Sequence, residues 1–265
     1  MPGSPCLIGL PYDASSSFLR GAADAPPAIR SALHSPAGNW WTEAFQDLSA
    51  PGGLMDCGDL VLPPDASARP LIEARIGRIL DDGGLPIALG GDHSVSYPVL
   101  RALGPRYPDL TILHIDAHPD LYDQFEGNRH SHACPFARIM EDKLAARLVQ
   151  IGIRASTRHQ REQADWFGVE TIDMREWSAG VRPSLGGPVY VSIDLDGLDP
   201  AFAPGVTHPE PGGLTVRDVI SVIQTLPRPL VGADVVELNP GRDRLGVTAT
   251  VAAKLVKELA GRMLG

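Results

Sequence analysis

The sequence contains no long hydrophobic run and few cysteines. No apolar stretch of its 265 residues approaches the roughly 20 residues that a membrane-spanning helix needs. The first residues, Met-Pro-Gly-Ser-Pro, lack the basic region and apolar core of a signal peptide. The three cysteines, Cys6, Cys57 and Cys134, are widely spaced and form no Cys-x-x-Cys pair, which indicates free thiols in a reducing compartment. We therefore expect a cytoplasmic protein with no membrane partner.

Several common functional motifs are also missing. The sequence has no G-x-G-x-x-G fingerprint and no G-x-x-x-x-G-K-[ST] loop, which argues against dinucleotide and nucleoside triphosphate binding. It has no G-x-S-x-G motif of the kind that carries a nucleophilic serine in hydrolases. The formal net charge is −9 and no cluster of Lys and Arg stands out, so we expect no nucleic-acid partner. An acidic surface field instead favours a cationic small molecule.

Strand-like and helix-like segments alternate along almost the whole chain. Apolar, strand-like runs cover Cys6–Leu10, Leu85–Leu89, Leu110–Ile115, Leu148–Ile153, Val189–Leu195 and Leu230–Val236. Helical patterns cover Pro26–Leu33, Arg69–Leu80, Ser94–Leu103, Cys134–Arg147, Gln160–Phe167, Thr215–Thr225 and Thr248–Met263, with Thr215 as a candidate N-cap. This rhythm predicts an α/β fold in which helices cover both faces of a mostly parallel sheet. We expect one domain over residues 1–265, because α/β domains of this length are commonly single.

Three Gly- and Pro-rich stretches interrupt the alternation: Ser35–Pro64, Pro119–Ala133 and Ala201–Gly213. None is long enough to form a domain. The last two directly follow polar motifs at the ends of predicted strands, where functional loops of α/β proteins gather. They are therefore predicted to form the walls of a pocket.

Six side chains that bind metals follow the predicted strands: His93, Asp116, His118, Asp120, Asp194 and Asp196. Residues i, i+2 and i+4 of an extended chain point the same way, so each motif presents its ligands on one side. In parallel α/β sheets, bound molecules lie at the carboxyl ends of the strands, and the three motifs and Glu237 are all predicted to lie there. Four carboxylates and two imidazoles at one place require compensating positive charge. The pattern predicts a pair of divalent cations, and hard oxygen ligands favour manganese or magnesium over zinc.

A pair of cations predicts metal-assisted hydrolysis, because it lowers the pKa of a shared water from 15.7 towards roughly 7. Single residues have simpler interpretations: a lone Asp after a strand caps a turn, and His93 alone could be a core histidine. His114 is interpreted as structural. Ser94 lies beside His93, but adjacent residues at one strand end rarely form a catalytic dyad.

The motifs resemble those of the ureohydrolase family of arginases, agmatinases and their relatives. The shared motifs are Gly-Gly-Asp-His-Ser (90–94), Asp-Ala-His-Pro-Asp (116–120) and Ser-Ile-Asp-Leu-Asp-Gly-Leu-Asp-Pro (192–200). Plant-type arginases and their bacterial relatives are the most similar group, through residues 125–128, 131–141, 199–206 and 231–237. The resemblance implies a three-layer α/β/α sandwich, two Mn²⁺ ions per subunit and a homotrimer or homohexamer.

The resemblance also implies roles for individual residues. His93, Asp116, Asp120 and Asp194 correspond to the ligands of one manganese, and Asp116, His118, Asp194 and Asp196 to those of the other. Asp116 and Asp194 then bridge the two ions. Hydroxide supplied by the metal pair attacks the guanidinium carbon, and the products are urea and an amine. Asp120 also holds the hydroxide, and the carboxylate of Glu237 binds the planar guanidinium.

The leaving amine needs a proton, which histidine can supply near neutral pH. His132 matches the family's shuttle histidine in register because Pro135 and Phe136 follow it, although His130 resembles the corresponding histidine of animal arginases. We predict His132 as the shuttle and His130 as a substrate contact, with Asn128 at the α-carboxylate. L-arginine is the predicted substrate, and agmatine, guanidinobutyrate and guanidine remain alternatives.

Alternatives of other classes stay open at this point. A two-metal phosphoesterase would need basic residues near the metals, whereas Glu237 is acidic. A deacetylase-type relative would use one zinc ion. A non-catalytic metal-binding regulatory protein could also keep the fold, but here all six candidate ligands are intact.

Overall fold

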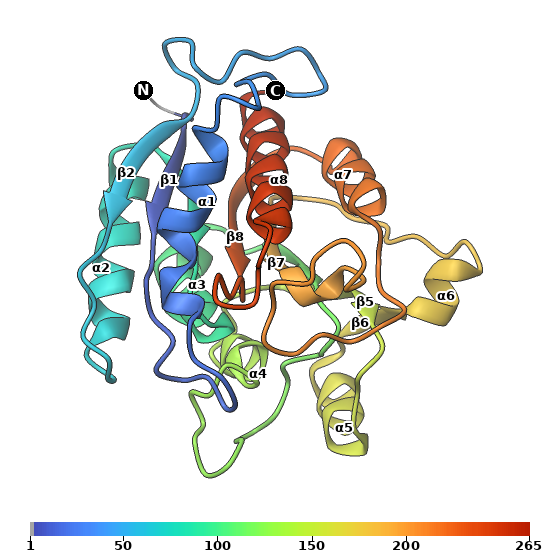
Figure 1. Cartoon of the computed structure of the whole chain (residues 1–265). Coiled ribbons are helices and arrows are strands. Elements are labelled where there is room, and N and C mark those ends of the chain that lie inside the picture. Colours follow the sequence, from blue (N-terminus) through green and yellow to red (C-terminus); the bar gives the residue numbers. More distant parts are fainter. Residues whose placement is uncertain (1–2) are drawn as a thin grey trace.

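The computed structural model describes residues 3–265, in which eight strands form one sheet. In chain order the strands are β1 (Pro5–Gly9), β2 (Met55–Asp59), β3 (Leu85–Leu89), β4 (Thr111–Ile115), β5 (Arg147–Ile153), β6 (Glu170–Asp173), β7 (Val189–Asp194) and β8 (Leu230–Val236). Their spatial order is β2-β1-β3-β8-β7-β4-β5-β6, and every neighbouring pair is parallel (Figure 1). The predicted parallel sheet is confirmed.

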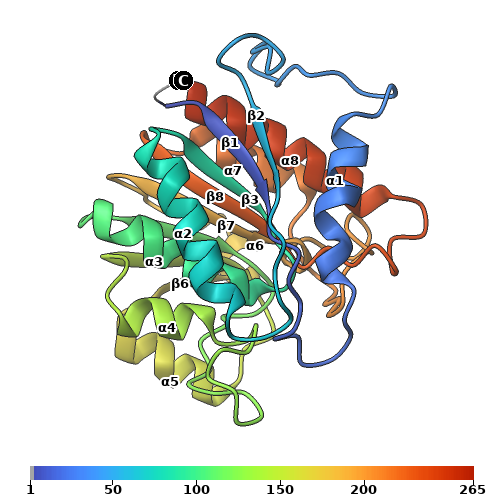
Figure 2. The same ribbon diagram turned by 90° about the vertical axis from the view of Figure 1, so that its left-hand side faces the viewer.

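Residues 3–265 contain eight α-helices, of which the first seven connect strands and the last follows β8: α1 (Ala25–Leu33), α2 (Ala68–Asp81), α3 (Ser96–Leu103), α4 (Pro135–Glu141), α5 (Arg158–Phe167), α6 (Met174–Ser178), α7 (Val216–Thr225) and α8 (Val247–Leu264). Helices α2, α3, α4 and α5 lie on one side of the sheet, and α1 and α8 lie on the other (Figure 2). Two separate apolar clusters result, one on each face of the sheet. The three-layer α/β/α sandwich is therefore confirmed.

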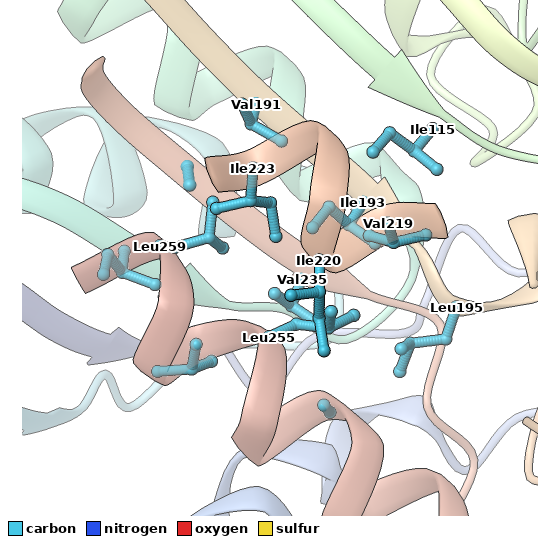
Figure 3. Close-up of a cluster of buried hydrophobic side chains, with 14 of the residues drawn as sticks. Ile115, Val191, Ile193, Leu195, Val219, Ile220, Ile223, Val235, Leu255 and Leu259 are labelled. Atoms are coloured by element: carbon cyan, nitrogen blue, oxygen red, sulfur yellow. The ribbon is translucent and has the colours of Figure 1, made fainter. Parts of the chain in front are cut away.

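Alternation along the strands divides their side chains between the two clusters. In β7, Val191 and Ile193 pack with α7 and α8, whereas Tyr190 packs on the opposite face. Figure 3 shows Val191 beside Ile223 and Ile193 beside Val219, both partners being on α7, with Leu255 of α8 in the same cluster. Strands buried on both faces have to be apolar throughout, which is why the central strands could be recognised in the sequence.

The structure differs from the prediction at four elements. The predicted helix Cys134–Arg147 ends at Glu141, because Lys143 adopts a positive φ of 54° and the chain turns into β5. Strands β2 and β6 were not predicted; they form the two edges of the sheet, and their side chains are exposed or half-buried. Helix α6 was also not predicted. By contrast, Thr215 caps α7 as expected, through its side chain and the N–H of Asp218.

The order of the strands explains why the polar motifs can meet. The motifs follow β3, β4, β7 and β8, and these four strands are adjacent in the centre of the sheet. A short 3-10 helix, η4 (Leu195–Gly197), passes close to the end of β4. A Cβ atom at Gly197 would lie 2.8 Å from the backbone nitrogen of Asp116, so only glycine permits this approach. None of the helices within residues 3–265 is both long and apolar enough to cross a membrane.

Candidate metal centre and substrate cleft

Three of the predicted ligands surround one imidazole nitrogen of a fourth, His93. His93 Nδ1 lies 3.2 Å from Asp116 Oδ2, 3.1 Å from Asp120 Oδ2 and 3.2 Å from Asp194 Oδ2. His93 and Asp116 are fully buried, and the other two are nearly so. Nδ1 is itself buried and has no hydrogen-bond partner among the described residues. A lone pair enclosed by three carboxylates is the arrangement expected around a cation.

A second group lies next to the first and shares one residue with it. His118 Nδ1 is 3.2 Å from Asp196 Oδ2 and 3.5 Å from Asp116 Oδ1. Asp116 therefore presents one oxygen to each imidazole, as a bridging carboxylate must. His118 is the most exposed of these three residues, and it lines the open cleft.

Backbone amides hold these carboxylates in place. The N–H of His118 donates to Asp116 Oδ1 at 2.6 Å, and the N–H of Asp196 donates to Asp194 Oδ1 at 2.8 Å. Asp196 in turn accepts the N–H of Ala117 at 3.1 Å, which joins the β7 motif to the β4 motif. Each Asp-x-[His/Asp] motif thus closes a small turn that fixes its own carboxylate.

The charges of the cluster are unbalanced without cations. Burial, together with the charges of Asp196 and Asp116, raises the pKa of Asp194 well above its ordinary value. Burial and the charge of Asp116 raise the pKa of Asp196 to about 7. Burial opposes a charge on His118, but the carboxylate of Asp196 outweighs it and raises the His118 pKa to about 12. The metal-free cluster therefore retains protons at positions that cations would take.

The surroundings of His93 fit a metal ligand. Ser192 Oγ donates its only proton to Asp234 Oδ1 at 2.6 Å, so it must accept from His93 Nε2, which lies 2.9 Å away. The neutral ring then carries its proton on Nε2 and leaves Nδ1 free to bind a cation. Tyr190 donates to the other oxygen of Asp234, and all four residues are fully buried. Ligand atoms bound at about 2.1 Å in octahedral geometry lie roughly 3 Å apart, which agrees with the distances around Nδ1.

Glu237 and His132 form a pair beside the cluster. Glu237 Oε1 accepts the N–H of His93 and lies 2.8 Å from His132 Nδ1. His132 Nε2 lies 2.8 Å from Ser17 Oγ, so both ring nitrogens are held. Burial opposes protonation of His132, but the charge and hydrogen bond of Glu237 outweigh it and raise the His132 pKa to about 9. Burial in turn would raise the pKa of Glu237, but the charge of His132 lowers it.

A cleft of about 170 Å³ opens onto these groups. Its lining includes four candidate ligands, His118, Asp120, Asp194 and Asp196, together with the pair Glu237 and His132, and with Tyr122, Phe125, Ala133 and His208. The latter four come from the stretches 119–133 and 201–213, so the prediction that these form the pocket walls is confirmed. Ser17, Ala155 and Gln160 also line the cleft and were missed. They lie outside the strand-end motifs, and no local pattern marks them in the sequence.

Two predicted substrate contacts do not line this cleft. Asn128 is exposed, and its Oδ1 accepts the N–H of His130 within the same turn. The His130 ring packs against Tyr97 of α3, with 5.7 Å between the ring centroids. The sequence motif placed these residues in the correct loop, but it could not show that their side chains turn away from the cleft. His132, two residues further on, is the histidine that faces Glu237.

The three cysteines are free thiols, as expected; Cys6 and Cys134 are buried and Cys57 is half-buried. The cytoplasmic location that was inferred from them is wrong by comparison with known proteins. Plant arginases similar to this chain are named mitochondrial, or chloroplastic and mitochondrial, enzymes. Free cysteines report a reducing environment, which does not distinguish the cytoplasm from the inside of these organelles.

The comparisons agree with the geometry of the site. A sequence model of a protein family, described as "Arginase family", matches residues 4–261. Arginase 1 of Arabidopsis thaliana is 48% identical over 98% of this chain and 81% of its own. An agmatinase of Bacillus anthracis is 34% identical over 96% of this chain and 89% of its own. The structure of an arginase from Medicago truncatula has a TM-score of 0.93 at 47% identity, over 98% of this chain and 87% of that one. The chain belongs to the arginase family.

Proposed function

We propose that the protein hydrolyses L-arginine to L-ornithine and urea with two Mn²⁺ ions per subunit. The observation that carries the proposal is the pair of carboxylate–imidazole groups sharing Asp116, next to the buried Glu237 and His132. Full-length similarity to plant arginases supports the choice of arginine. One domain over the whole chain, assembled as a homotrimer or homohexamer, completes the proposal.

The described residues fit a pair of hard divalent cations. One ion would be held by His93, Asp116, Asp120 and Asp194, and the other by Asp116, His118, Asp194 and Asp196. Oxygen-rich sites with few imidazoles favour Mn²⁺ among the common divalent ions. When bound, such a pair supplies hydroxide at neutral pH by lowering the pKa of a water molecule.

Glu237 is the proposed guanidinium-binding residue. Both hydrogen bonds that its side chain makes within residues 3–265 go to Oε1, from His93 N and from His132 Nδ1. Oε2 has no protein partner among those residues, and Glu237 lines the cleft. The planar N–H groups of a guanidinium can donate to this oxygen, which places the guanidinium carbon beside the metal centre.

His132 is the proposed proton donor to the leaving nitrogen. Its raised pKa keeps the ring protonated at neutral pH, and Glu237 holds it through Nδ1. Nε2 is the nitrogen that passes the proton to the departing amine. Once it has lost that proton, it accepts the backbone N–H of Ser17, which lies 3.2 Å away. Asp120 lies beside His93 and lines the cleft, so its carboxylate would accept a hydrogen bond from the hydroxide that the metal pair supplies.

Agmatine is the second candidate, since the chain is 34% identical to a protein named agmatinase. Arginine and agmatine differ only by the α-carboxylate. The cleft lining contains no Arg or Lys, and His208 is the only histidine there with no proposed role in the metal centre or in proton transfer. Recognition of a carboxylate in this cleft therefore depends on neutral donors such as Ser17, Gln160 and His208.

The test is a urea assay of the Mn²⁺-loaded protein with arginine, agmatine, 4-guanidinobutyrate and guanidine, accompanied by metal analysis. We expect two Mn²⁺ per chain and the highest kcat/KM with arginine. A higher kcat/KM with agmatine would replace arginine by agmatine as the substrate. Absence of urea from all four compounds, or a single zinc ion per chain, would overturn the proposed reaction. Asp116→Ala serves as the inactive control.

A further inference from the structure

A buried histidine outside the two groups of candidate ligands contacts their shared carboxylate. His114 lies on β4 and is fully buried, and its Nε2 is 2.7 Å from Asp116 Oδ2. The ring stacks on Phe136 of α4, with 3.8 Å between the ring centroids and an interplanar angle of 27°. His114 therefore has a fixed orientation towards Asp116.

Gln150 on the neighbouring strand β5 determines which nitrogen of His114 carries the proton. The Gln150 side-chain nitrogen lies 2.7 Å from the carbonyl oxygen of Pro119 and 2.9 Å from His114 Nδ1. A carbonyl oxygen can only accept, so the amide must direct its NH₂ group at Pro119 rather than its oxygen. The same NH₂ group donates to His114 Nδ1, and the hydroxyl of Thr171 donates to Gln150 Oε1 at 3.3 Å.

The consequence is a defined chain of donors. With Nδ1 accepting from Gln150, the neutral ring carries its proton on Nε2 and donates it to Asp116 Oδ2. The N–H of His118 donates to Asp116 Oδ1 from the other side. Two donors, one on each oxygen, fix the plane of this carboxylate between the two imidazoles of the proposed ligands.

We propose that His114 and Gln150 are positioning residues of the metal centre, which hold Asp116 so that each of its oxygens faces one cation. This proposal rests on the proposed dimetal function. Residues that orient metal ligands affect metal affinity by about 10- to 100-fold in other proteins. If His114 acted only by packing against Phe136, a change at Gln150 would not alter Mn²⁺ affinity. The effect of Gln150 on Mn²⁺ affinity therefore distinguishes a positioning role from a merely structural one.

The experiment measures Mn²⁺ binding to the metal-free protein by titration calorimetry, together with urea release at limiting and saturating Mn²⁺. His114→Phe keeps an aromatic ring on Phe136 but removes the hydrogen bond to Asp116. We expect it to weaken Mn²⁺ binding about 10- to 100-fold. Gln150→Leu should weaken it less, and the double variant should bind no more weakly than His114→Phe, because both residues act through one chain. Saturating Mn²⁺ should restore most of the activity.

His34→Phe is the matched control, since it makes the same substitution on an exposed histidine far along the chain from the motifs. It should leave Mn²⁺ binding unchanged. Equal affinities of the wild type and Gln150→Leu would overturn the proposal, even if His114→Phe failed to fold. Additive losses in the double variant would also overturn it. If the wild-type protein bound no Mn²⁺, the proposed metal centre itself would be wrong. If the wild type binds two Mn²⁺ ions and Gln150→Leu binds them equally well, only the positioning role is wrong.

Discussion

His132→Asn tests the proposed proton donor most directly. Asparagine keeps a donor of similar reach near Glu237 but cannot transfer a proton to the leaving amine. In the wild type, Glu237 and Ser17 hold the two ring nitrogens at 2.8 Å each, so the ring is already oriented for the reaction. None of the six candidate metal ligands is removed by this change.

The expected loss follows from the role of the ring. A positioned general acid contributes about 10²- to 10⁴-fold, so kcat should fall at least about 100-fold while Mn²⁺ content stays at the wild-type value. The stability of the metal-free protein should also depend on pH. The rise of the His132 pKa from 6.5 to about 9 corresponds to about 3 kcal/mol of stabilisation. A raised pKa gives stability that is complete below pH 6.5 and is lost as the pH rises through about 9.

The assay combines steady-state urea release, metal analysis and urea denaturation of the metal-free protein at pH 6 and pH 10. The wild type should be more stable than His132→Asn at pH 6, and the difference should shrink at pH 10. His130→Asn is the matched control, because that ring packs on Tyr97 outside the cleft. The reasoning is refuted if His132→Asn retains kcat within threefold of the wild type, or if His130→Asn loses as much activity.

Three further substitutions test separate parts of the structure. Asp116→Ala removes the ligand shared by both groups, so Mn²⁺ content should fall below one ion per chain and urea release should stop; normal Mn²⁺ content would contradict the bridging role. Gly197→Ala places a Cβ atom 2.8 Å from the Asp116 backbone nitrogen and should reduce activity more than tenfold with weaker Mn²⁺ binding. Gly186→Ala, which meets no atom within 4 Å, should change neither, and equal effects of the two would argue against the steric explanation. Thr215→Ala removes the N-cap of α7 and should lower the free energy of unfolding by about 1 kcal/mol with kcat unchanged, as measured by chemical denaturation.

The central part of the fold could be predicted because burial leaves a strong pattern. Strands β3 and β8 match the predicted ranges residue for residue, since both are mostly apolar runs; Gly84 and Gly90 flank β3, and Pro229 and Glu237 flank β8. The edge strand β2, Met-Asp-Cys-Gly-Asp, has no such pattern, because most of its side chains remain exposed. The prediction extended helix α4 too far, because Leu144 and Ala145 continue its apolar pattern. Only the backbone turn at Lys143 reveals where the helix ends.

The site divides in a similar way. The meeting of the candidate ligands could be predicted because each follows a strand, and parallel strands bring their carboxyl ends together. Ser17, Gln160 and His208 arrive from different parts of the chain, so their meeting in the cleft depends on tertiary packing. At Asn128 the motif shared with relatives suggested a substrate contact, but a motif does not report the direction of a side chain. Asn128 is exposed and does not line the cleft. His114 was assigned a structural role for lack of its partner Gln150, which is 36 residues away.

Backbone strain gives a further reason to place the reaction between β4 and β8. Asp120 and Glu237 follow these strands and adopt positive φ values of 50° and 65°, a region that costs a non-glycine residue about 1 kcal/mol or more. Neither is glycine, although glycine would remove the cost. The side chains must therefore compensate for it: Asp120 faces His93 Nδ1, and Glu237 holds His132. Strain at these two positions and the raised pKa values of the buried Asp194 and Asp196 are costs that the fold carries at this site, and the cations of the proposed centre would offset the electrostatic part of them.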